Sequence, residues 1–306
     1  MMNLSSEQRV PHIGVCVCTY KRPLPLKRLL TDLDRQETGG LFAFSIVVAD
    51  NDEQRSAQST VAEFVLTSAV PVKYCVEPTR GIARARNKVV ASAEGEFIAF
   101  IDDDEFPAPG WLLTLFKALT EYKVDGVLGP VKRHFDETPP AWLQRSSLYE
   151  RKVNPTGMRV ACRESRTGNV LFDRKIIAGD AAPFRPEFKA GSDEDFFRRQ
   201  TEAGRIFIWS ADAVVFETVP SARWKRMYCV RKALLQGASA AHQQGRNTTS
   251  ILKSLIAIPL YALALPFALV LGQHRFMMLL LKTCNHLGKL LALVGIHIVR
   301  EAYVSD

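Results

Sequence analysis

The sequence has few cysteines, and none of them forms a recognisable pair. The 306-residue chain contains six, with no Cys-x-x-Cys motif and no histidine at the spacing of a zinc site. This scatter excludes a disulfide scaffold and favours a reducing compartment. The first ten residues are polar, so we also expect no secretory signal peptide. The cysteines are Cys16, Cys18, Cys75, Cys162, Cys229 and Cys284.

Acidic residues are missing from the C-terminal part of the chain. Between Thr218 and Arg300 there is no Asp or Glu but eleven Lys or Arg, whereas the whole chain carries a net charge of +8. The basic character therefore belongs to this part alone. Such a stretch suits either a nucleic acid or an anionic membrane surface, and its apolar content decides between the two.

Charged residues of either sign are missing from residues 254–274. Within this stretch, residues 255–271 are almost wholly apolar and are interrupted only by Pro259 and Pro266. A membrane-spanning helix needs about 20 apolar residues, so this length is marginal. The prolines favour a kinked or re-entrant form, and a buried helix of a soluble protein is the alternative. Positive charges flank both ends, which favours re-entry over spanning.

Residues 276–299 form a different pattern. At 100° per residue, Arg275, Lys282, Lys289 and Arg300 fall within about 20° of one line on an otherwise apolar helix. This pattern is typical of a helix that lies in a membrane interface. Upstream, residues 223–232 are basic and aromatic, which suits anionic headgroups. The apolar share is too large for a solvated phosphate-binding face, so we expect an anionic membrane surface as partner and no nucleic acid.

Strand and helix patterns alternate through the N-terminal two thirds of the chain. This alternation predicts an α/β fold with a mostly parallel sheet. An irregular stretch at residues 135–160 interrupts it, and we expect that stretch to shape the acceptor side. The expected strands are 12–18, 44–49, 70–76, 97–101, 125–131, 167–172, 206–209 and 213–216, and the expected helices are 26–33, 60–68, 81–93, 111–122 and one from residue 192.

Acidic residues follow two of these strands. The apolar run 97–101 stops at the four acids Asp102–Glu105, and strand 44–49 ends at Asp50. Open α/β sheets bind ligands at the carboxyl ends of their strands. Adjacent carboxylates suit a hard cation such as Mg²⁺ or Mn²⁺, which commonly brings a phosphate with it. The alternative for either acidic end alone is a solvated turn.

Three further acids, Asp193–Asp195, stand in the first turn of a predicted helix. There they favour the helix dipole, and Ser192 or Asp193 can cap the helix. Helix capping is therefore the alternative to a catalytic role.

Six short motifs occur in the order seen in family 2 glycosyltransferases of the GT-A fold. The chain resembles this family over roughly residues 11–221, and the resemblance implies a GT-A Rossmann-like mixed sheet flanked by helices. It also implies an inverting transferase that uses a nucleotide-diphosphate sugar, usually a UDP-sugar, with Mg²⁺ or Mn²⁺. The motifs are Cys18–Arg22, Val48–Asn51, Gly81–Asn87, Phe100–Glu105, Thr167–Asn169 and Gly191–Phe196.

The resemblance also implies roles for individual residues on the donor side. Asp102 and Asp104 match the acids that hold the metal and the diphosphate, and Asp103 would contact the ribose. Asp50 would accept a hydrogen bond from the base. The other residues that would line the nucleotide-sugar site are Thr19, Tyr20, Arg22, Arg80, Arg86 and Asn87.

On the acceptor side, Asp193 matches the general base of the family. Ser192 replaces the acid that usually precedes it, so Glu194 or Asp195 remains an alternative base. Glu217 stands roughly where some members carry a metal-binding histidine, which makes it a candidate third metal ligand.

We therefore expect a catalytic domain at residues 1–221 and a basic, apolar helical membrane-association region at 222–306. The expected activity is sugar transfer to a hydroxyl of a glycan or lipid-linked glycan in cell-surface polysaccharide synthesis, on the cytoplasmic face of the inner membrane. A nucleotidyltransferase that uses the same acids is one alternative. A catalytically silent membrane-bound subunit that binds sugar nucleotide or glycan is another.

Overall fold

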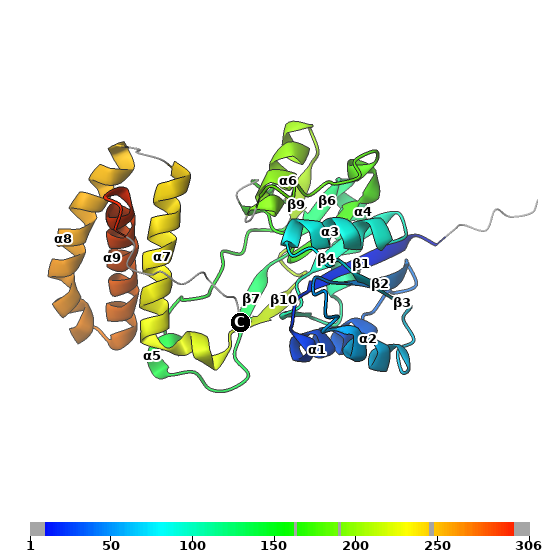
Figure 1. Ribbon diagram of the computed structural model, residues 1–306, viewed down its shortest axis with the longest axis horizontal. Coiled ribbons are helices and arrows are strands. Elements are labelled where there is room, and N and C mark those ends of the chain that lie inside the picture. Colours follow the sequence, from blue (N-terminus) through cyan, green and yellow to red (C-terminus); the bar gives the residue numbers. More distant parts are fainter. Residues whose placement is uncertain (1–9, 162–163, 189–190, 245–247, 297–306) are drawn as a thin grey trace, which may run out of the picture. The chain divides into compact units, whose positions relative to one another are not determined.

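A computed structural model describes residues 10–161, 164–188, 191–244 and 248–296 (Figure 1). The chain divides into two compact units, the first comprising residues 1–133 and 151–218, the second residues 134–150 and 219–306. The strands are β1 (His12–Thr19), β2 (Ala43–Asp50), β3 (Val72–Val76), β4 (Phe97–Ile101), β5 (Glu105–Pro107), β6 (Gly126–Leu128), β7 (Val131–His134), β8 (Asn169–Asp173), β9 (Phe207–Trp209) and β10 (Val215–Thr218). The α-helices are α1 (Pro23–Asp34), α2 (Gln58–Val65), α3 (Ile82–Ser92), α4 (Trp111–Tyr122), α5 (Ala141–Gln144), α6 (Ser192–Glu202), α7 (Arg226–Gln244), α8 (Thr248–Val270) and α9 (Gln273–Leu293).

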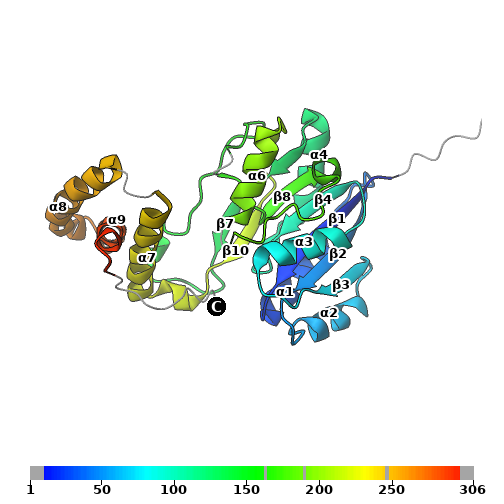
Figure 2. The same ribbon diagram turned by 45° about the horizontal axis from the view of Figure 1, so that its top comes forward.

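The first unit is built on a seven-stranded sheet in the order β3-β2-β1-β4-β8-β6-β9. Strand β8 runs antiparallel to both β4 and β6, and the other neighbouring strands are parallel. Figure 2 shows β8 beside β4, with β1, β2 and β3 following across the sheet. The predicted α/β fold with a mixed, mostly parallel sheet is therefore confirmed.

Both faces of this sheet are covered. On one face Ile13 and Val15 pack with residues of α1, α2 and α4, including the fully buried Trp111. On the other face Cys16 packs with Val89 of α3 and Phe196 of α6. Strands covered on both sides bury every position, which explains why their sequences are continuous apolar runs.

The expected strand 125–131 is in fact two strands in two sheets. Strand β6 lies in the main sheet, whereas β7 joins a three-stranded sheet in the order β5-β10-β7. Gly129 and Pro130 separate them, and the Gly129 backbone packs so closely on Ala213 that a side chain would clash. Proline has no N–H for a ladder, so the chain leaves the main sheet at this point.

In the second unit, α9 packs against both α7 and α8. Helices α7 and α9 approach closely at Gly237, where a β-carbon would lie 1.9 Å from the Asn285 carbonyl oxygen. Only glycine permits this backbone approach. The core of the unit comprises Trp142, Leu143, Cys229, Ala233, Met277, Leu281 and Cys284.

The expected basic stripe on α9 is interrupted. Arg275 and Lys282 are exposed, but Lys289 is 8% exposed and its ammonium donates to Ser250 of α8. His286, near the same line, hydrogen-bonds Ser254 of α8 at 3.0 Å. The expectation of one continuous interfacial stripe is wrong at Lys289 because α8 packs along that side. Arg300 lies outside the described residues.

Helix α8 continues through Pro259 and Pro266, and re-entry of this segment into a membrane stays a prediction. By length and composition, α8 and α9 are the two described helices that could cross a membrane. Much of α8 is apolar and exposed, which is typical of a surface that meets lipid or a partner. Its exposed side chains include Leu252, Leu255, Ile256, Leu260, Leu263 and Phe267.

Candidate active site

The acids that follow β4 lie beside the end of β1, because these two strands are parallel neighbours. Asp103 is 5% exposed and accepts hydrogen bonds from Thr19 Oγ1 at 2.7 Å and Arg22 Nη1 at 3.1 Å. The same Arg22 nitrogen donates to Asp104 at 3.0 Å. Thr19, Arg22, Asp103 and Asp104, all predicted as site residues, are thus brought together. One guanidinium holds two of the four acids.

The other two acids differ in exposure. Asp102 is exposed, whereas Glu105 is buried and accepts the Asp102 backbone N–H at 3.2 Å. Gly168, just before β8, packs against both side chains. A β-carbon there would lie 2.8 Å from Glu105 Oε1 and 2.9 Å from Asp102 Oδ2. A larger residue at this position would therefore displace the carboxylates of Asp102 and Glu105.

Desolvation raises the pKa of three of the four acids in the turn, namely Asp102, Asp103 and Glu105. The pKa of Asp102 rises to about 7: the residue is exposed to solvent, but Gly168 packs against its carboxylate. Arg86 opposes this rise, and Asp104, Asp103 and Asp193 add to it. Desolvation also raises the pKa of Asp103 to about 6, against the opposing effect of Arg22. Repulsion between carboxylates favours their protonated forms. A bound cation would stabilise the charged forms instead.

The described residues contain no group of three Asp, Glu, His or Cys side chains placed to hold a metal ion. Glu217 forms an ion pair with Arg151 instead of completing a carboxylate cluster. Glu217 as a third metal ligand stays a prediction. Mg²⁺ commonly binds through one or two carboxylates plus substrate phosphates, and Asp102 with Asp104 still suits that mode.

A residue that hydrogen-bonds the nucleotide base needs an accessible carboxylate oxygen, and Asp50 does not have one. It is fully buried, and its oxygens accept from Asp52 N at 3.1 Å, Ala57 N at 2.7 Å and Tyr74 Oη at 2.9 Å. These bonds hold the loop after β2 in place. Asp52, two residues later, is 6% exposed and keeps Oδ2 without a partner among the described residues.

Tyr20 and Arg80, both predicted on the nucleotide side, lie together. The Arg80 guanidinium stands 4.8 Å from the centre of the Tyr20 ring. Asn51 places the loop that carries Arg80, since its amide donates to the carbonyls of Glu77 (2.8 Å) and Thr79 (2.9 Å) and accepts from Gly81 N (2.8 Å). No role for Asn51 was predicted from the sequence. Its position directly after a strand, at the ligand-binding edge of the sheet, could have indicated one.

On α3, Arg86 and Asn87 have different functions. Arg86 Nη1 donates to Ser192 Oγ at 2.9 Å, and its Nη2 lies 4.0 Å from Asp193 Oδ2. Asn87 instead forms two hydrogen bonds with the backbone of Phe184, at 2.7 and 2.9 Å. Arg86 therefore lies beside Asp193 and near Asp102, whereas Asn87 anchors the loop before α6. Their contact with the nucleotide sugar stays a prediction.

The three acids at the start of α6 differ in exposure and in their partners. Asp195 is 5% exposed and accepts from Arg198 at 2.7 Å and Arg199 at 2.9 Å. Burial would raise its pKa, but these hydrogen bonds outweigh that effect and lower it. Glu194 is exposed, and Asp193 lies beside Arg86. Of the three, Asp193 is the carboxylate whose charge contributes to the raised pKa of Asp102 in the acid turn.

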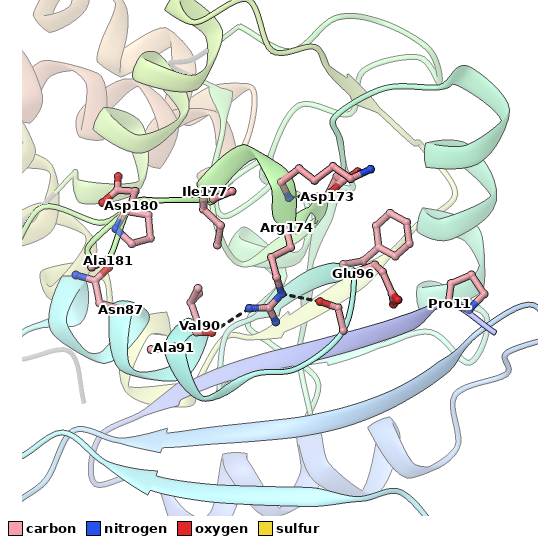
Figure 3. A pocket seen from close by; sticks show the side chains of 15 residues that line it. Pro11, Asn87, Val90, Ala91, Glu96, Asp173, Arg174, Ile177, Asp180 and Ala181 are labelled. Carbon is pink, nitrogen blue, oxygen red and sulfur yellow. Dashed lines mark hydrogen bonds and ion pairs between the residues drawn. The ribbon is translucent and has the colours of Figure 1, made fainter. Parts of the chain in front are cut away.

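A cavity of about 890 Å³ in the first unit is not this site. Figure 3 shows it beside Arg174, which donates to the carbonyls of Gly95 at 2.6 Å and Val90 at 3.5 Å. Pro11 and Phe97 line it, so it lies at the amino ends of β1 and β4. Asp102–Glu105 follow the opposite, carboxyl end of β4, where ligands of open α/β sheets bind.

Comparison with known proteins agrees with this arrangement. Residues 14–177, more than half of the chain, match the family model described as "Glycosyl transferase family 2". The chain belongs to glycosyl transferase family 2. Among curated members, it is 29% identical over 228 residues to the succinoglycan biosynthesis protein ExoM of Rhizobium meliloti (strain 1021), which covers 74% of this chain and 73% of ExoM. It is 22% identical over 206 residues to the glycosyltransferase AglE of Haloferax volcanii, covering 67% and 66% of the two chains.

Solved structures share the fold of this family 2 chain. Residues 1–349 of S. aureus TarS in complex with UDP superpose with a TM-score of 0.55 at 16% identity, covering 96% of this chain and 94% of that one. The mannosyltransferase PcManGT of Pyrobaculum calidifontis, in complex with GDP-Man and Mn²⁺, gives 0.56 at 19% identity, covering 92% and 88%. The glycosyltransferase fold predicted from the motifs is therefore confirmed.

Proposed function

We propose that the protein transfers a sugar from a nucleotide-diphosphate sugar, with UDP as the expected nucleotide, to a hydroxyl of a glycan or lipid-linked glycan in polysaccharide synthesis. The observation that carries this proposal is the placement of Asp102–Asp104 between Thr19 and Arg22 on one side and Arg86 with Asp193 on the other. The similarity to ExoM, named for succinoglycan biosynthesis, and to TarS, solved with UDP-GlcNAc, supports it.

On the donor side, Asp102 and Asp104 would hold Mg²⁺ or Mn²⁺ together with the diphosphate. A bound ion there would neutralise the charge that develops on the departing nucleoside diphosphate. Arg86 is a further cation beside the acids. Tyr20 and Arg80 would line the nucleotide, and the unpartnered oxygen of Asp52, rather than the enclosed Asp50, is the acceptor available for the base.

On the acceptor side, Asp193 would serve as general base. It would take the proton from the acceptor hydroxyl, whose oxygen forms a bond to the anomeric carbon as the bond to the diphosphate oxygen breaks. A single displacement of this kind inverts the anomeric configuration. Arg86 would hold Asp193 in position, whereas Asp195 is engaged by two arginines and is not available for this role.

We further propose that residues 222–306 hold the enzyme on the cytoplasmic face of the inner membrane. The apolar exposed side chains of α8 support this, together with exposed cations such as Lys225, Arg231 and Lys282. Anionic lipid attracts such cations by about 1 kcal/mol each. A membrane location motivates the lipid-linked acceptor.

A donor screen tests the proposed function. The full-length protein, with Mg²⁺ or Mn²⁺ and a lipid extract as acceptor, is incubated with a panel of nucleotide sugars while nucleoside diphosphate release is measured. We expect release with one donor and its loss on chelation. Pyrophosphate as the released product would identify a nucleotidyltransferase instead. Silence across the panel, or an Asp193→Asn variant with unchanged function, would favour a silent binding subunit.

A further inference from the structure

A second, smaller cavity lies in the first unit beside the acid turn. It measures about 140 Å³ and is formed by the ends of β6 and β9, by Asn169 at the start of β8, and by residues of the 151–154 and 164–166 segments. A cavity of about 150 Å³ holds a ring the size of benzene, so this cavity has room for part of a sugar unit. The chain between these two segments is held by β9, since Gly157 N donates to the Trp209 carbonyl at 2.9 Å and Trp209 N to that of Met158 at 2.9 Å.

The cavity adjoins the catalytic acids. Asn169 lines it, and the preceding residue, Gly168, touches the carboxylates of Asp102 and Glu105. Arg166, another lining residue, interacts electrostatically with Asp193, the base proposed above. A group bound in this cavity would therefore lie on the side from which an acceptor hydroxyl approaches.

Two deeply buried polar atoms at the cavity have no partner within the described ranges. Asn154 is 3% exposed, and its Oδ1 is unpaired although its Nδ2 donates to Glu164 at 3.1 Å. Trp209 is 7% exposed, and its Nε1 is unpaired. A buried polar atom without a hydrogen bond destabilises the protein. A ligand that has both a hydroxyl and an acceptor oxygen could therefore satisfy Asn154 Oδ1 and Trp209 Nε1.

The lining is also predominantly cationic. It has three cations, which are Arg151, Lys152 and Arg166, and one acid, Glu164. Arg151 is paired with Glu217, and Lys152 Nζ lies 3.7 Å from Glu164 Oε1. Among the described residues, Arg166 has neither a hydrogen bond nor an ion pair of its own. Its planar guanidinium is suited to bidentate binding of a carboxylate.

We propose that this cavity is an acceptor subsite for an acidic sugar unit, such as a uronic acid, of the glycan that receives the transferred sugar. The proposal rests on the proposed function. Arg166 would bind the carboxylate, Trp209 Nε1 would donate to a ring substituent, and Asn154 Oδ1 would accept from a sugar hydroxyl. A phosphodiester has no hydroxyl for Asn154, so an acidic sugar satisfies the site better than a lipid phosphate.

Acceptor competition tests this subsite. With the donor found in the screen, kcat/KM is compared for a glucuronide, the glucoside of the same aglycone and a glycosyl phosphate. We expect the glucuronide to exceed the glucoside at least tenfold, and Arg166→Gln to remove this preference through KM, by about tenfold to a hundredfold. Arg159→Gln, between the two lining segments but outside the cavity, is the matched control.

Calorimetric titration of the full-length protein with the glucuronide tests the cavity without turnover. Trp209→Phe removes the indole N–H together with one ring of the indole, so its thermal unfolding is measured beside its binding. Binding that weakens in Arg166→Gln, and in Trp209→Phe at an unchanged Tm, supports the subsite. Equal use of both glycosides, no detectable binding, or a stronger preference for the glycosyl phosphate would overturn it. A raised KM for the donor in Arg166→Gln would place that arginine on the donor side and overturn it as well. Failure of every donor in the screen would count against the proposed function, whereas the titration result would still decide the subsite.

Discussion

At the scale of single residues, the three acids at the start of α6 show how local geometry separates similar side chains. Successive helical residues point about 100° apart, so Asp193 faces Arg86, Glu194 faces solvent and Asp195 faces the arginines of its own helix. Only Asp193 combines partial exposure with proximity to the acid turn. The general base and the structural carboxylate thus stand two positions apart.

Asp193→Asn should abolish most of the transferase activity. Removing a general base costs about 10²- to 10⁴-fold in rate, and we expect the loss in kcat with little change in the KM for the donor. Steady-state kinetics with the donor identified by the screen measures this. Glu194→Gln is the control and should retain activity within about twofold. A loss in Glu194→Gln equal to that in Asp193→Asn would reassign the base.

Asp195→Asn should act on stability instead. Hydrogen bonds from Arg198 and Arg199 hold the pKa of Asp195 below its ordinary value, so its charged form stabilises the fold by about 2 kcal/mol. This contribution is complete above the unfolded-state pKa of about 3.9 and is lost as the pH falls through the lower folded-state value. Thermal unfolding at pH 7 should show a lower Tm for the variant. The difference between the two proteins should shrink below pH 4; a constant difference would contradict the ion-pair role.

At the scale of elements, the segment joining β4 to β5 depends on β8. Gly168 lets β8 begin against two carboxylates, and Asn169 then ties the neighbouring elements together. Its Oδ1 accepts from Trp111 Nε1 at 2.8 Å, and its Nδ2 donates to the carbonyls of Pro130 at 3.0 Å and Ala213 at 2.7 Å. The Gly-Asn pair therefore fixes where the acids stand relative to the sheet.

Gly168→Ala should displace the acid turn. Its new methyl group would meet Glu105 and Asp102 at 2.8–2.9 Å, and overpacking typically costs about 1–3 kcal/mol. We expect at least a tenfold lower kcat/KM and a higher Mg²⁺ concentration for half-maximal activity. Metal titration of activity measures both. Gly110→Ala, where nothing lies within 4 Å of the new atom, should behave as the parent protein does.

Three departures from the predicted elements share one cause, namely contacts between segments distant in sequence. The run 125–131 splits because Gly129 must pass Ala213. Lys289 leaves the basic stripe because Ser250 of α8 reaches it. Within the irregular 135–160 stretch, Met158 and Val160 pair with the β9 strand at Trp209 and Phe207. Periodicity in one segment carries no information about the partner that covers it.

In the molecule as a whole, the residues proposed for catalysis and the helices proposed for membrane attachment belong to different compact units. The first unit contains every residue of the proposed active site. The second consists mainly of the helices α7 to α9, with residues 134–150 packed among them. The boundary at residue 221 drawn from the sequence remains a prediction about function, and the structure adds a sequence-distant segment to the second unit.

Introducing charge on α8 should release the protein from membranes. Leu263 and Phe267 are 72% and 73% exposed, and a charged residue in a membrane helix costs about 2.5–3.5 kcal/mol. In flotation with vesicles containing anionic lipid, Leu263→Glu with Phe267→Glu should reduce the bound fraction at least tenfold. Leu66→Glu, at a position of the first unit that is 85% exposed, should bind as the parent protein does. Unchanged flotation of the α8 variant would show that another surface carries the attachment.

Three features could be predicted from local patterns along the chain, because each depends on neighbouring residues: the alternating α/β pattern, the acids at the strand end and the apolar C-terminal helices. The order of six short motifs was enough to indicate the family. Other features became visible only in the folded chain: Asp50 is enclosed, Glu217 pairs with Arg151, and Asp195 is held by arginines. Each of these outcomes depends on hydrogen-bond partners and burial. Folding sets both by bringing remote segments together, and the identity of the residue alone does not reveal them.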